Sequence, residues 1–139
     1  MRSASDAGSR ANAWVRTFPL LAFTLWLALL GAGVATAQPV RIVVQSSPLA
    51  GFRYHDAPAV FAQLRPGDPL ALVREPANPH DANAVRVEWQ GHMLGYVPRA
   101  ENAAVAWALD RGEPLQARVS RVREHPNPRM RVEVEVFME

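Results

Sequence analysis

Short segments in which apolar and polar residues alternate run through residues 40–139, and this feature most constrains what the chain can fold into. In residues 84–89, for example, Val85 and Val87 fall on one face and charged residues fall on the other. A period of two is typical of strands with one buried face. Six segments show such alternation or a run of β-branched residues bounded by turn residues: 40–45, 70–74, 84–89, 93–97, 115–123 and 130–137. They predict a mostly β domain.

Two segments have helical spacing instead. Residues 57–64 place their larger apolar side chains on one side, before a Pro-Gly-Asp turn. Residues 102–111 are rich in alanine, with Asn102 as the predicted N-cap and Gly112 as a left-handed helix stop. The predicted order is strand, helix, strand, strand, strand, helix, strand, strand. Six strands and two short helices in a chain of this length predict a small twisted barrel or a strongly curved sheet.

The first 37 residues have a different character. Arginines precede an apolar run at 18–34, and small residues follow it at 35–37. This layout is typical of a secretory signal peptide cleaved after Ala37, which predicts an exported, periplasmic protein. The apolar run is also close to the length that spans a bilayer, so a second interpretation is an uncleaved hydrophobic helix that anchors the protein in the inner membrane. A third is a mis-assigned start codon, which leaves the protein in the cytoplasm.

Setting residues 1–37 aside changes the charge balance. The chain has 15 Lys plus Arg, 13 Asp plus Glu and a formal net charge of +2, but residues 1–37 hold three Arg and one Asp. The remaining residues therefore carry equal numbers of basic and acidic side chains, and every basic one is Arg. A neutral domain lacks the many phosphate contacts of a protein that coats DNA nonspecifically. A local pocket lined by arginine, whose planar fork suits phosphate, remains open.

Cysteine is absent from the sequence. Disulfides, zinc sites with cysteine ligands and thiol nucleophiles are thereby excluded. Two of the four histidines, His55 and His80, precede an aspartate, but none has the i, i+4 helical spacing of a zinc-protease site. The sequence also has no nucleophile elbow, phosphate-binding loop or paired-carboxylate motif. We therefore expect no metal site, no cofactor and no catalytic activity.

Three segments between the predicted elements carry side chains that suit ligand binding. They are SPLAGFRY at 47–54, LVREPANPHDANAVRV at 72–87 and LGYVPR at 94–99. Each has a purely structural interpretation, since Gly, Pro and Asn fix turns and bulges. An arginine and a tyrosine after a glycine turn can also offer a guanidinium to phosphate and a ring to a base.

In this order and spacing, the three segments resemble the HIRAN domain family, and the resemblance extends over residues 40–139. It implies an OB-like or SH3-like β-barrel that binds the 3′ end of single-stranded DNA without catalysis. It also implies a stand-alone domain, rather than one fused to a helicase or a nuclease. The site residues that it implies are Arg53, Tyr54, His80, Asp81, Tyr96 and Arg99.

The resemblance assigns an expected role to each of these residues. Arg53 and Tyr54 match an Arg-Tyr pair that meets the DNA after the glycine turn. Asp81 matches an aspartate that accepts a hydrogen bond from the free 3′-hydroxyl, and such a carboxylate repels a 3′-phosphate. Arg99 matches a lysine that contacts phosphate.

Two positions depart from the family pattern. His80 stands where the family has a tyrosine that stacks on the terminal base, and Tyr96 stands where it has a histidine. The ring at the first position is smaller, and the second position loses a group that titrates near neutral pH.

The leader-like segment supports a competing hypothesis. An exported protein meets little DNA, so the domain would bind a protein partner or an envelope polymer instead. OB-like barrels accept both oligonucleotides and oligosaccharides, so the predicted fold is compatible with either ligand.

Overall fold

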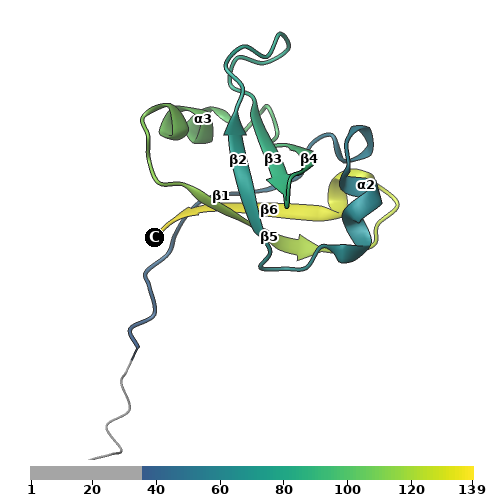
Figure 1. Ribbon diagram of the computed structural model, residues 1–139, viewed down its shortest axis with the longest axis horizontal. Coiled ribbons are helices and arrows are strands. Elements are labelled where there is room, and N and C mark those ends of the chain that lie inside the picture. The colour runs from purple at the N-terminus through teal and green to yellow at the C-terminus, as the bar shows by residue number, and fades with distance from the viewer. Residues whose placement is uncertain (1–35) are drawn as a thin grey trace, which may run out of the picture. The chain divides into compact units, whose positions relative to one another are not determined.

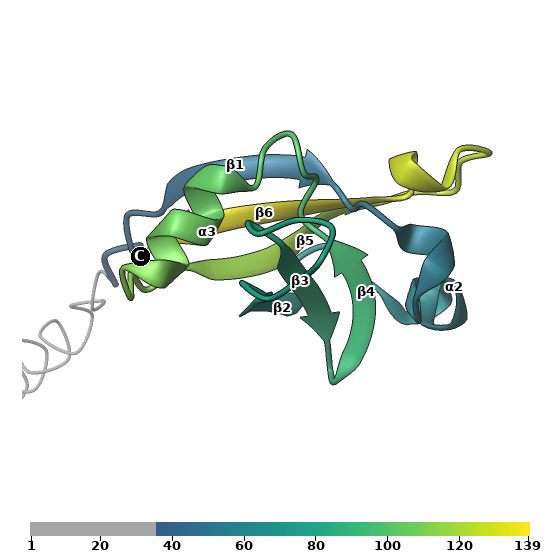
Figure 2. The same cartoon turned by 90° about the horizontal axis from the view of Figure 1, so that it is seen from above.

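The structure is a computed structural model that describes residues 36–139. Its six strands form one antiparallel sheet in the order β1-β6-β5-β2-β3-β4 (Figure 1). The strands are β1 (Ile42–Pro48), β2 (Pro69–Arg74), β3 (Val85–Trp89), β4 (His92–Tyr96), β5 (Gln116–Val122) and β6 (Val132–Met138). The half formed by β2, β3 and β4 crosses over the half formed by β1, β5 and β6 (Figures 1 and 2). The mostly β fold predicted from the alternating pattern is confirmed.

A single bridge joins the two edges of this sheet. Ala50 follows the edge strand β1, and its backbone N–H and C=O each bond to Tyr96 at the end of the other edge strand, β4, at 2.9 Å. The curved sheet is thereby closed at one point, as in a small barrel. The bridge brings the chain after β1 against the end of β4.

Gly95 allows this close approach. Its φ is +155°, and a Cβ placed there would lie 2.2 Å from the carbonyl oxygen of Ala50. The neighbouring pairing of β3 with β4 shifts between Val87 and Glu88, so β4 carries a bulge at this point. Position 95 therefore requires glycine for two reasons, its positive φ at the bulge and the lack of room for a Cβ beside the Ala50 backbone.

The apolar core lies on the inner face of the sheet. Along β6, Val132, Val134 and Val136 are buried, while the glutamates between them are half-exposed. The same alternation holds along β3. Residues exposed by less than 2% include Leu49, Leu64, Leu94, Val85, Val87, Val105, Val119, Val132 and Val136. Burial of each such side chain stabilises the fold by roughly 1.5–3 kcal/mol relative to exposure.

The two predicted helices are present, and both are short. The first is α2 (Ala57–Val60), which continues as the 3-10 turn η3 (Phe61–Gln63). The second is α3 (Ala103–Asp110), and Gly112 beyond it has a φ of +74°, as expected for a left-handed stop. Two further 3-10 turns are η2 (Phe52–Tyr54) and η4 (Pro128–Met130).

Two predicted strand boundaries are wrong. The first strand was predicted to end at residue 45, before a Ser-Ser-Pro turn, but β1 continues to Pro48. As an edge strand it pairs with β6 alone, so the N–H that proline lacks is not needed on its open side. The last strand was predicted to begin at Met130, but that residue belongs to η4 and β6 begins at Val132.

The predicted signal peptide or membrane anchor at residues 1–37 lies outside the described residues, except for its last two positions. Within residues 36–139, no helix has the length and hydropathy needed to cross a bilayer.

Candidate functional site

Two adjoining concavities bring the three predicted loop segments together. The first, called the Asp81 pocket below, has a volume of about 390 Å³ and is lined by Ala50, His55, Asn78, His80, Asp81, Ala84, Tyr96, Val97 and Arg99. The second, the arginine cleft, has a volume of about 480 Å³ and is lined by Ala50, Gly51, Phe52, Arg53, Tyr54, Pro98, Arg99, Ala100, Asn127, Pro128 and Arg129. Ala50 and Arg99 line both. All six predicted site residues therefore lie on one connected surface, and their roles in binding stay predictions.

Asp81 keeps acceptor capacity that faces its pocket. Its Oδ1 accepts from the backbone N–H of Asn83 at 2.9 Å, and its Oδ2 accepts from Nδ2 of Asn102 at 2.7 Å. A carboxylate has about four lone-pair sites, so further donors can still be accepted. Partial burial raises the pKa of Asp81, but the two hydrogen bonds and the charges of Arg99 and Arg74 outweigh burial and lower it overall. Asp81 is thus an ionised acceptor at neutral pH.

Asn102 has a different role from the one predicted for it. It precedes α3, but its side chain makes no capping hydrogen bond. Asn102 is only 2% exposed, and its side chain donates to Asp81 instead. A backbone φ of −84° and ψ of −13° leaves Asn102 in the helical region rather than the extended one that a capping side chain usually requires. The buried amide therefore holds the carboxylate, and the N-cap prediction is wrong in this respect.

Replacing Asn102 by alanine is expected to raise the pKa of Asp81 and to lower the free energy of unfolding by about 1.5–3 kcal/mol at pH 7, the range for a hydrogen bond to a charged group. A lowered carboxyl pKa contributes stability above the ordinary value, and that stability is lost as the pH falls through the folded pKa. The wild-type and Asn102→Ala proteins should therefore differ less in free energy of unfolding at acid pH than at pH 7. NMR titration of the Asp81 carboxyl and urea unfolding measure both effects.

The matched control is Asn83→Ala, because Asn83 reaches Asp81 through its backbone N–H, which alanine retains. This variant should leave the pKa of Asp81 unchanged. An Asn102→Ala protein with the wild-type carboxyl pKa would contradict the role assigned to the buried amide.

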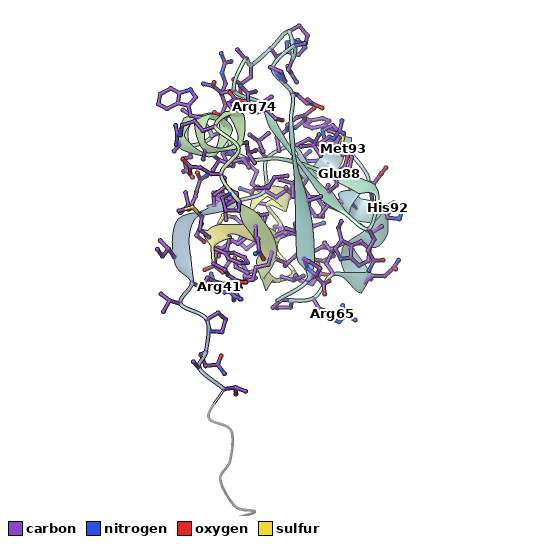
Figure 3. All side chains as sticks on the ribbon, turned by 60° about the vertical axis from the view of Figure 1, so that its left-hand side comes forward. Arg41, Arg65, Arg74, Glu88, His92 and Met93 are labelled. Atoms are coloured by element: carbon purple, nitrogen blue, oxygen red, sulfur yellow. The ribbon has the colours of Figure 1, made fainter. Side chains whose placement is uncertain are left out.

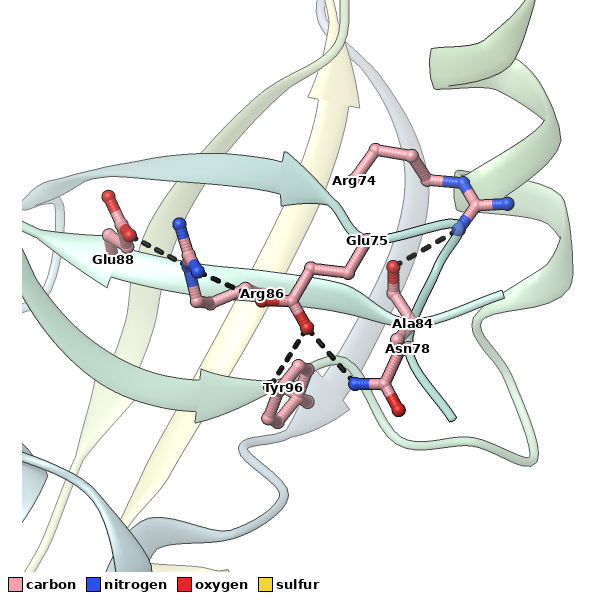
Figure 4. Close-up of polar contacts among 7 residues, drawn as sticks. All are labelled: Arg74, Glu75, Asn78, Ala84, Arg86, Glu88 and Tyr96. Atoms are coloured by element: carbon pink, nitrogen blue, oxygen red, sulfur yellow. Dashed lines mark hydrogen bonds and ion pairs between the residues drawn. The ribbon is translucent and has the colours of Figure 1, made fainter. Parts of the chain in front are cut away.

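Glu75 holds two residues that line the Asp81 pocket, Asn78 and Tyr96 (Figure 4). Its carboxylate accepts from Nδ2 of Asn78 at 3.1 Å, from the Tyr96 hydroxyl at 2.9 Å and from Nη1 of Arg86 at 2.9 Å. The Asn78 bond is the largest cause that lowers the pKa of Glu75, with Tyr96 and Arg86 acting in the same direction. Arg86 also pairs with Glu88 at 2.8 Å, so this network continues along β3.

Tyr96 is held by this network. Burial and the hydrogen bond to Glu75 raise the pKa of Tyr96, so its hydroxyl stays protonated as a donor to Glu75. The donor is therefore already used, and the ring becomes a fixed wall of the pocket.

The loop that carries His80 and Asp81 is shaped by its own side chains. Oδ1 of Asn78 accepts from the backbone N–H of His80 at 2.9 Å, and the imidazole itself is exposed. At the base of the loop, Arg74 pairs with Asp110 of α3 at 3.1 Å. Figure 3 shows Arg74 beside α3, at the opposite end of the domain from Arg65. The loop is thus tied to the helix that supplies Asn102.

His55 is a pocket residue that the sequence analysis did not include in the site. Its ring packs edge-on against Tyr96, with centroids 5.6 Å apart and planes at 70°. It also lies 3.4 Å from where a Cβ on Gly51 would sit. The sequence offers little indication of this position. His55 follows the Arg-Tyr pair, but no local pattern predicts that its ring packs against Tyr96 of β4.

Arg53, Tyr54 and Arg99 present exposed side chains to the arginine cleft. Tyr54 is 83% exposed, so its ring is accessible to a ligand. Gly51, with a φ of +79°, immediately precedes η2, in which Phe52 is buried and Arg53 and Tyr54 are exposed. Among residues 36–139, no group of three His, Cys, Asp or Glu side chains is placed to hold a metal ion.

Comparison with protein families identifies the domain. The model of the HIRAN domain matches residues 42–139. The chain belongs to the HIRAN domain family. The matched residues include all six strands, both concavities and all six predicted site residues.

Two solved structures share the HIRAN fold seen here. A protein from Lactobacillus plantarum is 28% identical, with a TM-score of 0.61, and the match covers 70% of this chain and 94% of that one. The HIRAN domain of human HLTF is 20% identical, with a TM-score of 0.51, and the match covers 73% of this chain and 81% of that one. The second likeness supports the fold alone.

A curated relative carries a similar segment within a much longer protein. The Fanconi-associated nuclease 1 homolog of Oryza sativa subsp. japonica is 34% identical over 73 residues, which is 50% of this chain and 7% of that protein. The HIRAN-like stretch is therefore a small part of the nuclease homologue.

Proposed function

We propose that this HIRAN domain binds the 3′-terminal nucleotides of single-stranded DNA as a non-catalytic module. The observation that carries the proposal is that an ionised carboxylate, Asp81, and an exposed guanidinium, Arg99, line one pocket that opens into the arginine cleft. A 3′ end combines a neutral donor, its free hydroxyl, with an anionic backbone on one side only. The site offers a matching acceptor for the hydroxyl, the Asp81 carboxylate, and next to it a cation for the backbone, the Arg99 guanidinium.

The carboxylate provides the end recognition. Asp81 can accept a hydrogen bond from a 3′-hydroxyl because each of its oxygens has used one lone pair on the protein and retains another. A 3′-phosphate would bring negative charge against this anion. Asn102 and Asn83 hold the carboxylate in place, so little ordering is needed when the ligand arrives.

The rings and guanidiniums provide the sequence-independent part of the affinity. Tyr96, edge-packed by His55, forms an apolar wall, and the exposed rings of His80 and Tyr54 offer faces to bases. Base–aromatic stacking contributes about 1–3 kcal/mol per base and tolerates every base. Arg53 and Arg99, whose exposed side chains line the arginine cleft, neutralise the phosphates on the 5′ side of the terminal nucleoside.

The test compares two 5′-labelled oligonucleotides that differ only in a 3′-hydroxyl or a 3′-phosphate. Fluorescence anisotropy at moderate salt should show the 3′-hydroxyl form binding about tenfold more tightly or better, since a hydrogen bond to a charged acceptor is worth about 1.5–3 kcal/mol. Asp81→Ala should remove this preference. A thermal unfolding curve shows whether the variant is folded, because Asp81 also holds its own loop.

Glu124→Ala is the control, because Glu124 is exposed and lines neither the Asp81 pocket nor the arginine cleft. It should keep the preference for the hydroxyl. Equal wild-type affinities for the two ends would rule out end recognition.

A second candidate is an exported interaction domain that binds a protein or an envelope polymer, and the layout of residues 1–37 favours it. This candidate places the domain in the periplasm or on the inner membrane and assigns no nucleic-acid role to the pockets. The same titration separates the two, because the second candidate requires that no single-stranded oligonucleotide binds at moderate salt.

A further inference from the structure

Nine of the arginines in residues 36–139 have an acceptor within the protein. Six pair with a carboxylate: Arg41, Arg74, Arg86, Arg111, Arg118 and Arg121. Three donate to backbone carbonyl oxygens: Arg65, Arg123 and Arg131. In the described part of the chain, the guanidiniums without such an acceptor are those of Arg53, Arg99 and Arg129, and all three line the arginine cleft.

The arginine cleft also lacks a compensating negative charge. Its lining, as the structure describes it, contains three arginines and no aspartate or glutamate. In a domain with equal numbers of basic and acidic side chains, this is a local excess of positive charge with open donors. A concave surface of this kind focuses its field on an anion.

Arg129 comes from a segment outside the three motifs of the sequence analysis. It lies in η4, between β5 and β6, and Asn127 shapes that turn by accepting from the backbone N–H of Arg129 at 3.1 Å. Both ribbon views place this turn at the same end of the domain as α2 and the segment before it (Figures 1 and 2). Arg129 therefore lines the same cleft as Arg53 and Arg99, although it comes from a different segment.

We infer that the arginine cleft is a phosphodiester subsite and that Arg129 binds the second phosphodiester from the 3′ end. The inference rests on the proposed function. With the terminal nucleoside in the Asp81 pocket, Arg99 lies where the two concavities meet and receives the first phosphodiester. The strand then crosses the cleft between Arg53 and Arg129, so its 5′ side leaves toward the turn between β5 and β6.

The experiment uses 3′-hydroxyl oligonucleotides that carry one neutral methylphosphonate at the first, second or fifth linkage from the 3′ end. For the wild-type protein, a neutral first or second linkage should weaken binding about tenfold, while the fifth should have little effect. Arg129→Gln should weaken binding to the unmodified oligonucleotide by a similar factor. It should lose sensitivity to the second linkage and retain sensitivity to the first.

Salt dependence gives a second readout. Loss of one phosphate contact should lower the slope of log affinity against log salt by about 0.7 for a single strand. Arg121→Gln is the matched control, because Arg121 is exposed, pairs with Glu133 and lies outside the cleft, yet its loss changes the net charge equally. It should leave the methylphosphonate pattern and the slope unchanged.

The possible failures are distinguishable. If Arg129→Gln responds to every methylphosphonate as the wild type does, while the preference for a 3′-hydroxyl persists, the subsite is wrong and the proposed function stands. If the wild-type protein binds none of the oligonucleotides, the proposed function and the subsite both fail. A loss of sensitivity confined to the second linkage supports the path described here.

Discussion

Replacing Gly95 by alanine is expected to lower the free energy of unfolding by about 3 kcal/mol or more, a large fraction of what a domain of this size has. Two costs add together. At a φ of +155° a residue with a side chain is strained, and the new Cβ would lie 2.2 Å from the carbonyl oxygen of Ala50. That oxygen cannot move away without breaking its hydrogen bond to Tyr96, the bridge that joins the edges of the sheet. Urea unfolding monitored by tryptophan fluorescence measures the loss.

Gly67→Ala is the control that separates the two costs. Gly67 has a φ of +93°, but a Cβ there would meet no atom within 4 Å. It should therefore show only the backbone penalty of about 1–2 kcal/mol. If the two variants lose the same stability, the contact with Ala50 does not determine the choice of glycine at position 95.

The double substitution Arg53→Gln with Arg99→Gln is expected to weaken binding of a 3′-hydroxyl oligonucleotide by more than about 100-fold. Each guanidinium should lose a charge-assisted contact of about 1.5–3 kcal/mol, and the two losses add if they involve different phosphate oxygens. Both side chains are exposed, and neither has an acceptor within residues 36–139, so stability should change little. Anisotropy titration and thermal unfolding provide the two measurements.

The comparison requires a protein with the same charge and intact concavities. Arg111→Gln with Arg121→Gln also removes two positive charges, from exposed residues that pair with Glu113 and Glu133 outside the arginine cleft. Surface pairs of this kind contribute about 0–1 kcal/mol, so the control should fold normally. Equal losses of affinity in both double variants would mean that binding depends on net charge rather than on the site.

The sequence determined the fold class, most of the elements and the family. The valines of β3 and β6 recur at every second position because one face of each strand is buried, and that spacing is visible in the chain itself. Gly112 marked the end of α3 because a left-handed residue is a local requirement. The three motif segments indicate the HIRAN family by their order and spacing alone.

Only the tertiary structure decided how the site is held. Asn102 bonds to Asp81 and Tyr96 bonds to Glu75 across 21 residues of sequence in each case. Arg129 reaches the arginine cleft from a turn that no motif includes. Periodicity and turn chemistry report on neighbours within a few positions, whereas these contacts form only when the curved sheet brings its two edges together at Ala50 and Tyr96. Sheet closure is therefore what converts three separate loop segments into one connected surface.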